Sequence, residues 1–212
     1  MSDEEYAYTD EEGEYLVKLA RESLETRLNT GSQMVTPEDC PYPKLLEESG
    51  VFVTLRKFGQ SDSMSLRGCI GMIEARDSLL MGVIKMAIAA GLEDPRFPEV
   101  QESELDHLVF EITAMTVPKL LTTKDPEAIK NSIKIGRDGV IMEQGHQRGL
   151  FLPQVPVEQN WDIETYLPEA CRKAWLPRDA WKEKSTKIYT FQGEIFEEEK
   201  PRGHIVRKII TQ

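Results

Sequence analysis

The stretch GVFVTLRKFGQSDSMSLRGCIG, residues 50–71, decides the fold class of this chain. In its first part, Val51, Val53 and Leu55 alternate with Phe52, Thr54 and Arg56, and such alternation predicts a β-strand. A polar linker follows, and LRGCIG then begins a second extended segment. We therefore expect two neighbouring strands that form an antiparallel hairpin.

Helices are predicted on both sides of this hairpin and near the C-terminus. Thr9 and Glu12 form a capping box, apolar residues then recur at helical spacing, and Gly31 ends the pattern, which predicts a helix over residues 10–29. Asp77 or Ser78 begins a second apolar helix that Gly91 ends. A third helix is expected over residues 162–174.

The remaining extended segments favour an antiparallel sheet. Strands are predicted at 108–117, 132–137, 139–144, 149–152 and 187–196, with a tight hairpin at Arg137-Asp138-Gly139 joining the second and third of them. The order is helix, hairpin, helix, strand, meander, helix, strand, which is not βαβ alternation. The expected class is α+β, with a mainly antiparallel β-sheet flanked by helices.

Composition limits the function classes. The chain has 212 residues and a net charge of -11, and seven acidic residues lie among the first 15. That acidity makes nucleic-acid binding improbable. No apolar run is long enough to span a membrane, the acidic N-terminus is unlike a secretory signal, and three scattered cysteines favour a reduced, cytoplasmic location. The last residues, KPRGHIVRKIITQ, are expected to form a solvated basic tail, with the alternative that their apolar residues Ile205, Val206, Ile209 and Ile210 dock as a strand.

Cys69 is the residue in this sequence best suited to chemistry. On a strand, Arg67 and Cys69 project to the same face, and a guanidinium beside a thiol favours the nucleophilic thiolate. Gly68 and Gly71 flank the thiol, and we expect that at least one of them keeps space open for a ligand. The competing interpretation is a buried structural cysteine on a strand with a bulge, and no general base is visible nearby.

Several other residues are candidates for binding. Thr54 and Arg56 lie on the face of their strand opposite Val53 and Leu55, although Arg56 is equally typical of a surface ion pair. Arg96 lies in a stiff loop, as a binding clamp or as a structural arginine. No phosphate-binding, zinc or hydrolase motif is present and the three histidines are far apart, so neither a metal nor a cofactor is expected.

Five segments together resemble one family. LRGCIG, GVFVTLRK at 50–57, DPRF at 94–97, GLFLPQV at 149–155 followed by Glu158 and Trp161, and Cys171 followed by Lys173-Ala174 are similar to motifs of the AMME-syndrome candidate (AMMECR) family, in the family's order. The chain resembles an archaeal-type single-domain member. Two departures stand out: Arg137-Asp138-Gly139 replaces a common Lys-His-Gly, and Trp175 replaces a common glycine.

The resemblance implies an α+β domain over residues 8–198 with a smaller subdomain, an acidic tail at 1–7 and a basic tail at 199–212. It implies no established reaction, and whether the protein is an enzyme stays open. A Memo-like protein and a radical-SAM enzyme are partners suggested by family association. A small-molecule or protein ligand is expected in a cleft lined by the LRGCIG strand, with Cys69 as the reactive thiol and Arg67 tuning it. The predicted ligand-binding residues are Leu66, Gly68, Ile70, Gly71, Thr54, Arg56, Arg96, Gln154 and Glu158.

The alternative function is that of a non-enzymatic regulatory or interaction protein. In that case LRGCIG is an architectural strand, and a surface of the protein binds transcription, replication, repair or translation machinery.

Overall fold

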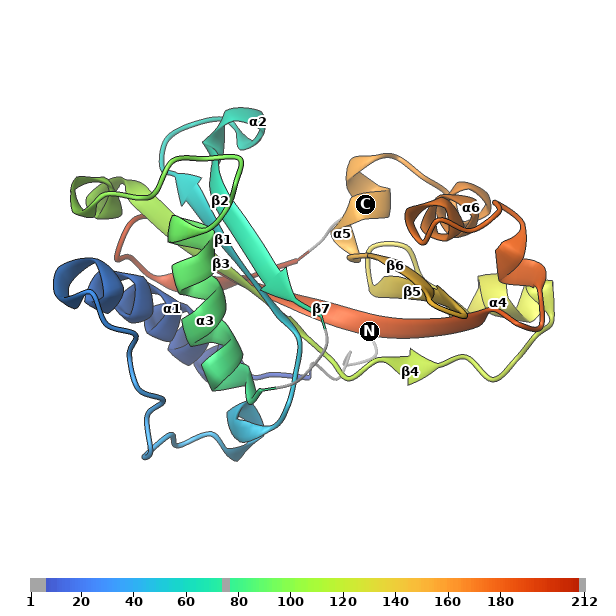
Figure 1. Ribbon diagram of the computed structural model, residues 1–212, viewed down its shortest axis with the longest axis horizontal. Helices are drawn as coiled ribbons and strands as arrows, with labels where there is room; N and C mark the ends of the chain where they lie inside the picture. The colour runs from blue at the N-terminus through green and yellow to red at the C-terminus, as the bar shows by residue number, and fades with distance from the viewer. Residues whose placement is uncertain (1–6, 74–76, 210–212) are drawn as a thin grey trace. The chain divides into compact units, whose positions relative to one another are not determined.

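A computed structural model describes residues 7–73 and 77–209 and divides the chain into two compact units. Of the described residues, the first unit contains those up to Met115 together with 194–208, and the second contains 116–193 and Ile209. The long strand β7 (Lys187–Glu198) contributes to both units, because its last five residues belong to the first unit (Figure 1).

The first unit is a helix-covered antiparallel sheet. Its other elements are α1 (Asp10–Thr30), η1 (Pro43–Leu46), β1 (Val51–Lys57), α2 (Asp62–Ser65), β2 (Leu66–Met72), α3 (Leu79–Leu92), η2 (Glu102–His107), β3 (Leu108–Met115) and β8 (Ile205–Lys208). The strand order is β2-β1-β3-β7, and β8 pairs with β7. Figure 1 shows α1 and α3 side by side against this sheet.

The alternation in residues 51–57 places the core of the first unit between the sheet and the two helices. Val51, Val53 and Leu55 are fully buried on the helix-facing side and pack with apolar residues of α1 and α3. The expected hairpin forms, with Thr54 opposite Cys69 and Phe52 opposite Gly71. Thr54, Cys69 and Phe52 therefore lie on the face of the sheet opposite this core.

The second unit is smaller and has a core of its own. Its elements are β4 (Lys119–Leu120), α4 (Pro126–Ser132), β5 (Asp138–Gln144), β6 (Gln147–Phe151), α5 (Gln154–Glu158), α6 (Ile163–Lys173) and η3 (Ala180–Lys182), with β5 between β6 and β7. Its buried cluster joins α6 to the inner side of β5. The α+β class, the mainly antiparallel sheet flanked by helices and the smaller subdomain are thus confirmed.

Two predicted segments are wrong in the structure. Of residues 132–137, Ser132 ends α4 and the others form a loop and turn and not a strand, because the Asp138 carboxylate accepts the main-chain N–H of Lys134 and holds the chain there, with Gly136 at φ 82°. The tight hairpin lies instead between β5 and β6 at Gly145, where φ is 61°.

The basic tail is the second correction. Residues 205–208 form β8, which pairs with the end of β7 from Ile195–Lys208 to Glu198–Ile205. Ile205 packs against the core of the first unit, so this apolar residue is removed from water despite the basic residues around it. Of the predicted acidic tail, residues 1–6 lie outside the described residues, and the predicted domain limits of 8 and 198 remain predictions.

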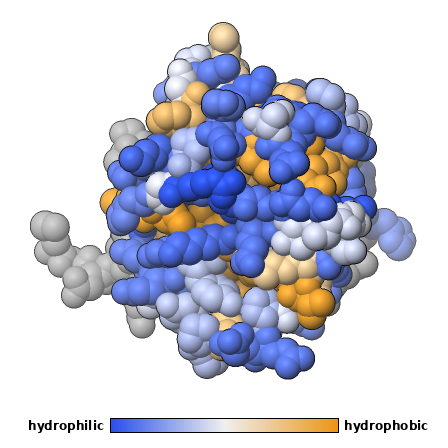
Figure 2. All heavy atoms as spheres, turned by 90° about the vertical axis from the view of Figure 1, so that its left-hand side faces the viewer, coloured by the Kyte–Doolittle hydropathy of each residue, from blue (hydrophilic) through white to orange (hydrophobic). Residues whose placement is uncertain are grey.

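Figure 2 views the molecule from the left-hand side of Figure 1, and that surface is mainly hydrophilic with small apolar patches. Among the described residues, no helix is long and apolar enough to cross a membrane.

Candidate functional site

Cys69 lies on the edge strand β2, directly opposite Thr54 of β1. The Thr54 hydroxyl donates a hydrogen bond to the Cys69 sulfur over 3.3 Å. The thiol is partly exposed, whereas Thr54 is buried. The sulfur therefore has a polar neighbour that belongs to the adjacent strand.

The loop that follows α3 fixes the main chain of Cys69. The main-chain N–H of Cys69 donates to Oδ2 of Asp94 over 2.8 Å, and Nη2 of Arg96 donates to the Cys69 carbonyl over 3.1 Å. Nε and Nη2 of Arg96 also bind the Asp94 carboxylate, over 2.9 and 2.6 Å. Asp94 and Arg96 thus satisfy the outward polar groups of an edge strand, as a neighbouring strand would.

The electrostatics of this site centre on Asp94 and Arg96. Hydrogen bonds from the Arg96 guanidinium, with further ones from main-chain N–H groups, hold the pKa of Asp94 well below its ordinary value. The pKa of Arg96 is raised, chiefly by Asp94 and in part by the neighbouring Cys69. The Arg96 guanidinium is therefore held against the main chain of Cys69.

Arg96 also has unused capacity to bind an anion. Its side chain is 53% exposed. Among the residues that the structure describes, its Nη1 group has no hydrogen-bond partner. Nε and Nη2 of Arg96 hold the loop, as its structural interpretation stated, and its role as a binding clamp stays a prediction.

Arg67 occupies a different environment from the predicted one. The β1–β2 register shifts at Leu55, so that Leu66 pairs with Arg56, Gly68 pairs with Leu55, and Arg67 is the extra residue of a bulge. Its Nε and Nη2 both bind the Glu104 carboxylate over 2.8 Å, and the residue is only 4% exposed. The pairing lowers the pKa of Glu104, with Arg67 as the main cause. Arg67 is thus committed to Glu104, and the predicted pairing of Arg67 with the thiol is corrected in favour of Arg96.

Neither glycine of LRGCIG keeps space open. A Cβ atom at Gly68 would overlap the main-chain carbonyl oxygen of Ala90 in α3, and one at Gly71 would overlap the ring of Phe52. Neither glycine has a positive φ. The expectation of an open space at one of them is therefore wrong: Gly68 permits close packing of helix on strand, and Gly71 accepts the aromatic ring of its cross-strand partner.

The other predicted site residues of the first unit either pack and pair within the sheet or take part in ion pairs. Ile70 packs against the core of the first unit, and Leu66 pairs with Arg56 across the bulge. The Nε atom of Arg56 lies 3.5 Å from the Glu111 carboxylate, which also accepts Lys208 over 3.4 Å. Arg56 thus belongs to an ion-pair cluster, as its second interpretation stated.

Gln154 and Glu158 lie on α5 of the second unit. Oε1 of Gln154 is shielded from solvent and has no hydrogen-bond partner within the described ranges, and Glu158 is exposed. The structure gives Gln154 an unsatisfied acceptor, and the predicted membership of both residues in the Cys69 site stays a prediction.

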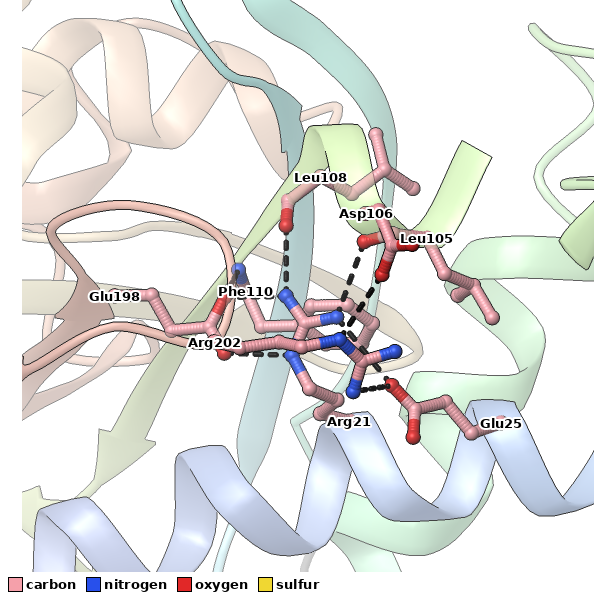
Figure 3. Close-up of polar contacts among 8 residues, drawn as sticks. All are labelled: Arg21, Glu25, Leu105, Asp106, Leu108, Phe110, Glu198 and Arg202. Atoms are coloured by element: carbon pink, nitrogen blue, oxygen red, sulfur yellow. Dashed lines mark hydrogen bonds and ion pairs between the residues drawn. The ribbon is translucent and has the colours of Figure 1, made fainter. Parts of the chain in front are cut away.

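A second polar cluster in the first unit was absent from the sequence interpretation. Arg21 of α1 donates to the Glu198 carboxylate from Nε and Nη2, to the carbonyls of Leu105 and Leu108, and to Glu25. Figure 3 shows this guanidinium pointing into a ring of acceptors contributed by four elements. All of its N–H groups are used, so Arg21 fastens α1 to β3 and β7. The acidic residues at the end of β7 are a sequence signal for a charge cluster, but the sequence does not indicate that Arg21 is their partner.

A cavity of about 210 Å³ adjoins this cluster, lined by residues of α1, of β7 and of the β7–β8 connection. Arg202 reaches across to Glu25 over 2.8 Å and to Asp106 over 3.0 Å. Four of the lining charges, Arg21, Glu25, Glu198 and Arg202, are linked to one another by ion pairs, which suits a structural contact better than a ligand site. Over residues 7–73 and 77–209, no three His, Cys, Asp or Glu side chains gather as metal ligands would.

Comparison with known proteins assigns the family. The AMMECR1 family model matches residues 17–196, which is most of the chain. This chain belongs to the AMMECR1 family. The resemblance read from LRGCIG and the other four motifs is therefore confirmed.

Archaeal relatives cover nearly the whole chain. The Pyrococcus horikoshii protein PH0010 is 49% identical over 94% of this chain and 96% of its own length. A protein of Thermococcus onnurineus is 48% identical over 96% of this chain and 98% of its own length. The crystal structure of the uncharacterized protein PH0010 matches with a TM-score of 0.85 at 48% identity, covering 96% of this chain and all of that one. The chain thus has the same fold as this solved relative.

Proposed function

We propose that this AMMECR1-family protein binds a small anionic ligand beside Cys69 and uses Cys69 as a reactive thiol. The observation that carries the proposal is the geometry around Cys69: a partly exposed residue, a hydroxyl donor on its sulfur from Thr54, and an exposed arginine, Arg96, that donates to its main-chain carbonyl. A cationic group beside a cysteine stabilises the thiolate, which is the nucleophilic form.

The roles of the three side chains follow from their contacts. Cys69 supplies the sulfur, and Thr54 fixes its direction. Arg96 has a free Nη1 group with which to bind a carboxylate or phosphate of the ligand, while Asp94 keeps the guanidinium in place through two hydrogen bonds. In this proposal Arg67 is a positioning residue, because its contact with Glu104 fixes the bulge that precedes Cys69.

The second candidate is a regulatory or interaction protein without a reactive thiol. It is favoured by the packing of Gly68 and Gly71, which gives LRGCIG a structural explanation, and by the Asp94–Arg96 pair, which covers a strand edge. Under this alternative the Memo-like and radical-SAM proteins suggested by family association are partners to test by co-purification.

Alkylation of the native protein separates the two candidates. We expect iodoacetamide at pH 7 to modify Cys69 faster than it modifies a short peptide with a free thiol, as followed by peptide mass mapping. Cys171 serves as an internal control because it is fully buried, and burial raises the pKa of its thiol to about 11. If Cys69 is protected until the protein is unfolded, the thiol is structural and the interaction protein becomes the better description.

A further inference from the structure

Trp175 is the residue of the second unit that folding explains least. It follows α6 directly, and 84% of its surface is exposed. Its φ is 61°, in the left-handed region. Because this large apolar side chain is mostly exposed to water, it contributes little burial free energy to the second unit.

The backbone at Trp175 is a position that suits glycine. The N–H of Trp175 donates to the carbonyl of Arg172 over 3.0 Å, and the N–H of Leu176 donates to that of Cys171 over 2.9 Å. These two bonds and the buried Leu176 make a Schellman motif, in which the left-handed residue is usually glycine. A side chain at such a position costs about 1–2 kcal/mol. The tryptophan therefore has a conformational cost and little packing gain.

Two arginines stand on either side of the indole in the sequence, and one carboxylate holds both. Nη2 of Arg172 lies 2.8 Å from Glu169, and Nη2 of Arg178 lies 2.9 Å from the other oxygen of the same group. Glu169 is nearly buried, whereas the side chains of Arg172 and Arg178 are 73% and 64% exposed. Each guanidinium has no other partner within the part of the chain described, so its remaining donors are available.

The surroundings add rigidity and positive charge. The amide of Gln147 donates to the carbonyl of Trp175 over 2.7 Å and ties it to the turn between β5 and β6. The second unit carries twelve basic and ten acidic residues, a net charge of +2, against -11 for the whole chain. The acidity that argues against nucleic-acid binding thus belongs to the first unit.

From these observations we propose that Trp175, Arg172 and Arg178 form a binding surface for single-stranded nucleic acid. An exposed aromatic ring is a stacking platform for a base, and guanidinium groups near it pair with phosphates. Trp175 lies between Arg172 and Arg178 in the sequence, so one base and the phosphates on either side of it would each have a matching group. The competing occupant is an acidic protein segment, which the test separates.

The test is a fluorescence titration of the full-length protein with a short single-stranded oligouridylate at low salt. Stacking on Trp175 quenches its emission, and Trp175→Gly weakens binding about tenfold or more. Trp175→Phe keeps a stacking ring and retains most of the affinity. Replacing both arginines, Arg172→Gln with Arg178→Gln, weakens binding and flattens its dependence on salt concentration.

Thermal unfolding of the same variants provides the second readout. Because glycine suits the left-handed position, Trp175→Gly keeps or raises the melting temperature, whereas a structural tryptophan would lower it. Unchanged oligouridylate binding in Trp175→Gly, no binding by the wild type, or a lowered melting temperature in Trp175→Gly overturns the proposal. Trp175-dependent binding of polyglutamate without binding of oligouridylate also overturns it, in favour of an acidic protein partner.

Discussion

At the scale of single residues, Cys69 and Cys171 show what distinguishes a functional thiol from a core thiol. Cys171 is fully buried in the apolar cluster of the second unit, whereas Cys69 is partly exposed beside a hydroxyl. We predict that Cys69→Ser costs less than about 1 kcal/mol of unfolding free energy, and that Cys171→Ser costs about 1–3 kcal/mol because a hydroxyl is placed among apolar groups. Urea unfolding measures both. A cost above about 3 kcal/mol for Cys69→Ser would mark that thiol as structural.

The two glycines beside Cys69 differ in what a methyl group would meet. At Gly68 it meets the main chain of α3, which cannot move without shifting the helix, and at Gly71 it meets the ring of Phe52. We predict a loss of about 3 kcal/mol for Gly68→Ala and about 1 kcal/mol for Gly71→Ala, measured by denaturant unfolding. In a Phe52→Ala background, Gly71→Ala should cost little. An equal cost in both backgrounds would mean that Phe52 is not what Gly71 accommodates.

The contribution of Asp94 to the stability of the fold depends on pH. Its pKa is lower in the folded protein than in the unfolded chain, so the folded state binds fewer protons. The stability it contributes is complete above its unfolded pKa of about 4 and is lost as pH falls through the depressed folded value. We predict that Asp94→Asn is less stable than the wild type at pH 7 and that the difference shrinks below about pH 4. A difference that is constant from pH 7 to strongly acidic solution would contradict this role for the carboxylate.

At the scale of elements, β8 is a terminal segment that ion pairs attach to the rest of the first unit. Arg207 donates to Asp10 over 2.9 Å and to the carbonyl of Tyr8 over 2.7 Å, pairs with Glu194, and lies over the ring of Phe196. The segment is basic in sequence, but its charge is used to attach it to the first unit.

Removal of β8 is therefore expected to be costly. We predict that truncation after Lys200 lowers the melting temperature strongly, and that Arg207→Ala alone costs about 3 kcal/mol because it leaves Glu194 without this partner. His204→Ala is the matched control on the same segment, since His204 is exposed, and it should stay within about 0.5 kcal/mol. If truncation at Lys200 is tolerated as well as His204→Ala, β8 is not part of the stable fold.

The elements that could be predicted are those with a local signal. The capping box at Thr9 and Glu12 and the cap at Asp162 begin helices where the sequence indicated. Residues 132–137 looked extended because Ile133 and Ile135 alternate, but a side-chain contact from Asp138 to the Lys134 main chain holds a turn there. β8 was missed for the opposite reason, because its partners in α1 and β7 are far away in the sequence.

At the scale of the whole molecule, the residues of the candidate site could be predicted from the sequence, but the contacts between them could not. Cys69, Thr54 and Arg96 are all present in the motifs, and the α+β class follows from the order of elements. The choice between Arg67 and Arg96 could not be made from the sequence, because it depends on a bulge that turns Arg67 to Glu104 and on a loop that returns Arg96 to β2. Strand alternation assigns faces only where the register is unbroken.

The rate of Cys69 alkylation across pH, compared between the wild type and Arg96→Gln, tests the proposed site most directly. Arg172→Gln is the control, because Arg172 is an exposed arginine of the second unit, and circular dichroism verifies that each variant is folded. We predict that Arg96→Gln slows alkylation at pH 7 by about tenfold, that the two rates converge at high pH, and that Arg172→Gln stays close to the wild type. Equal rates in the wild type and Arg96→Gln across the whole pH range would contradict an activated thiol at Cys69.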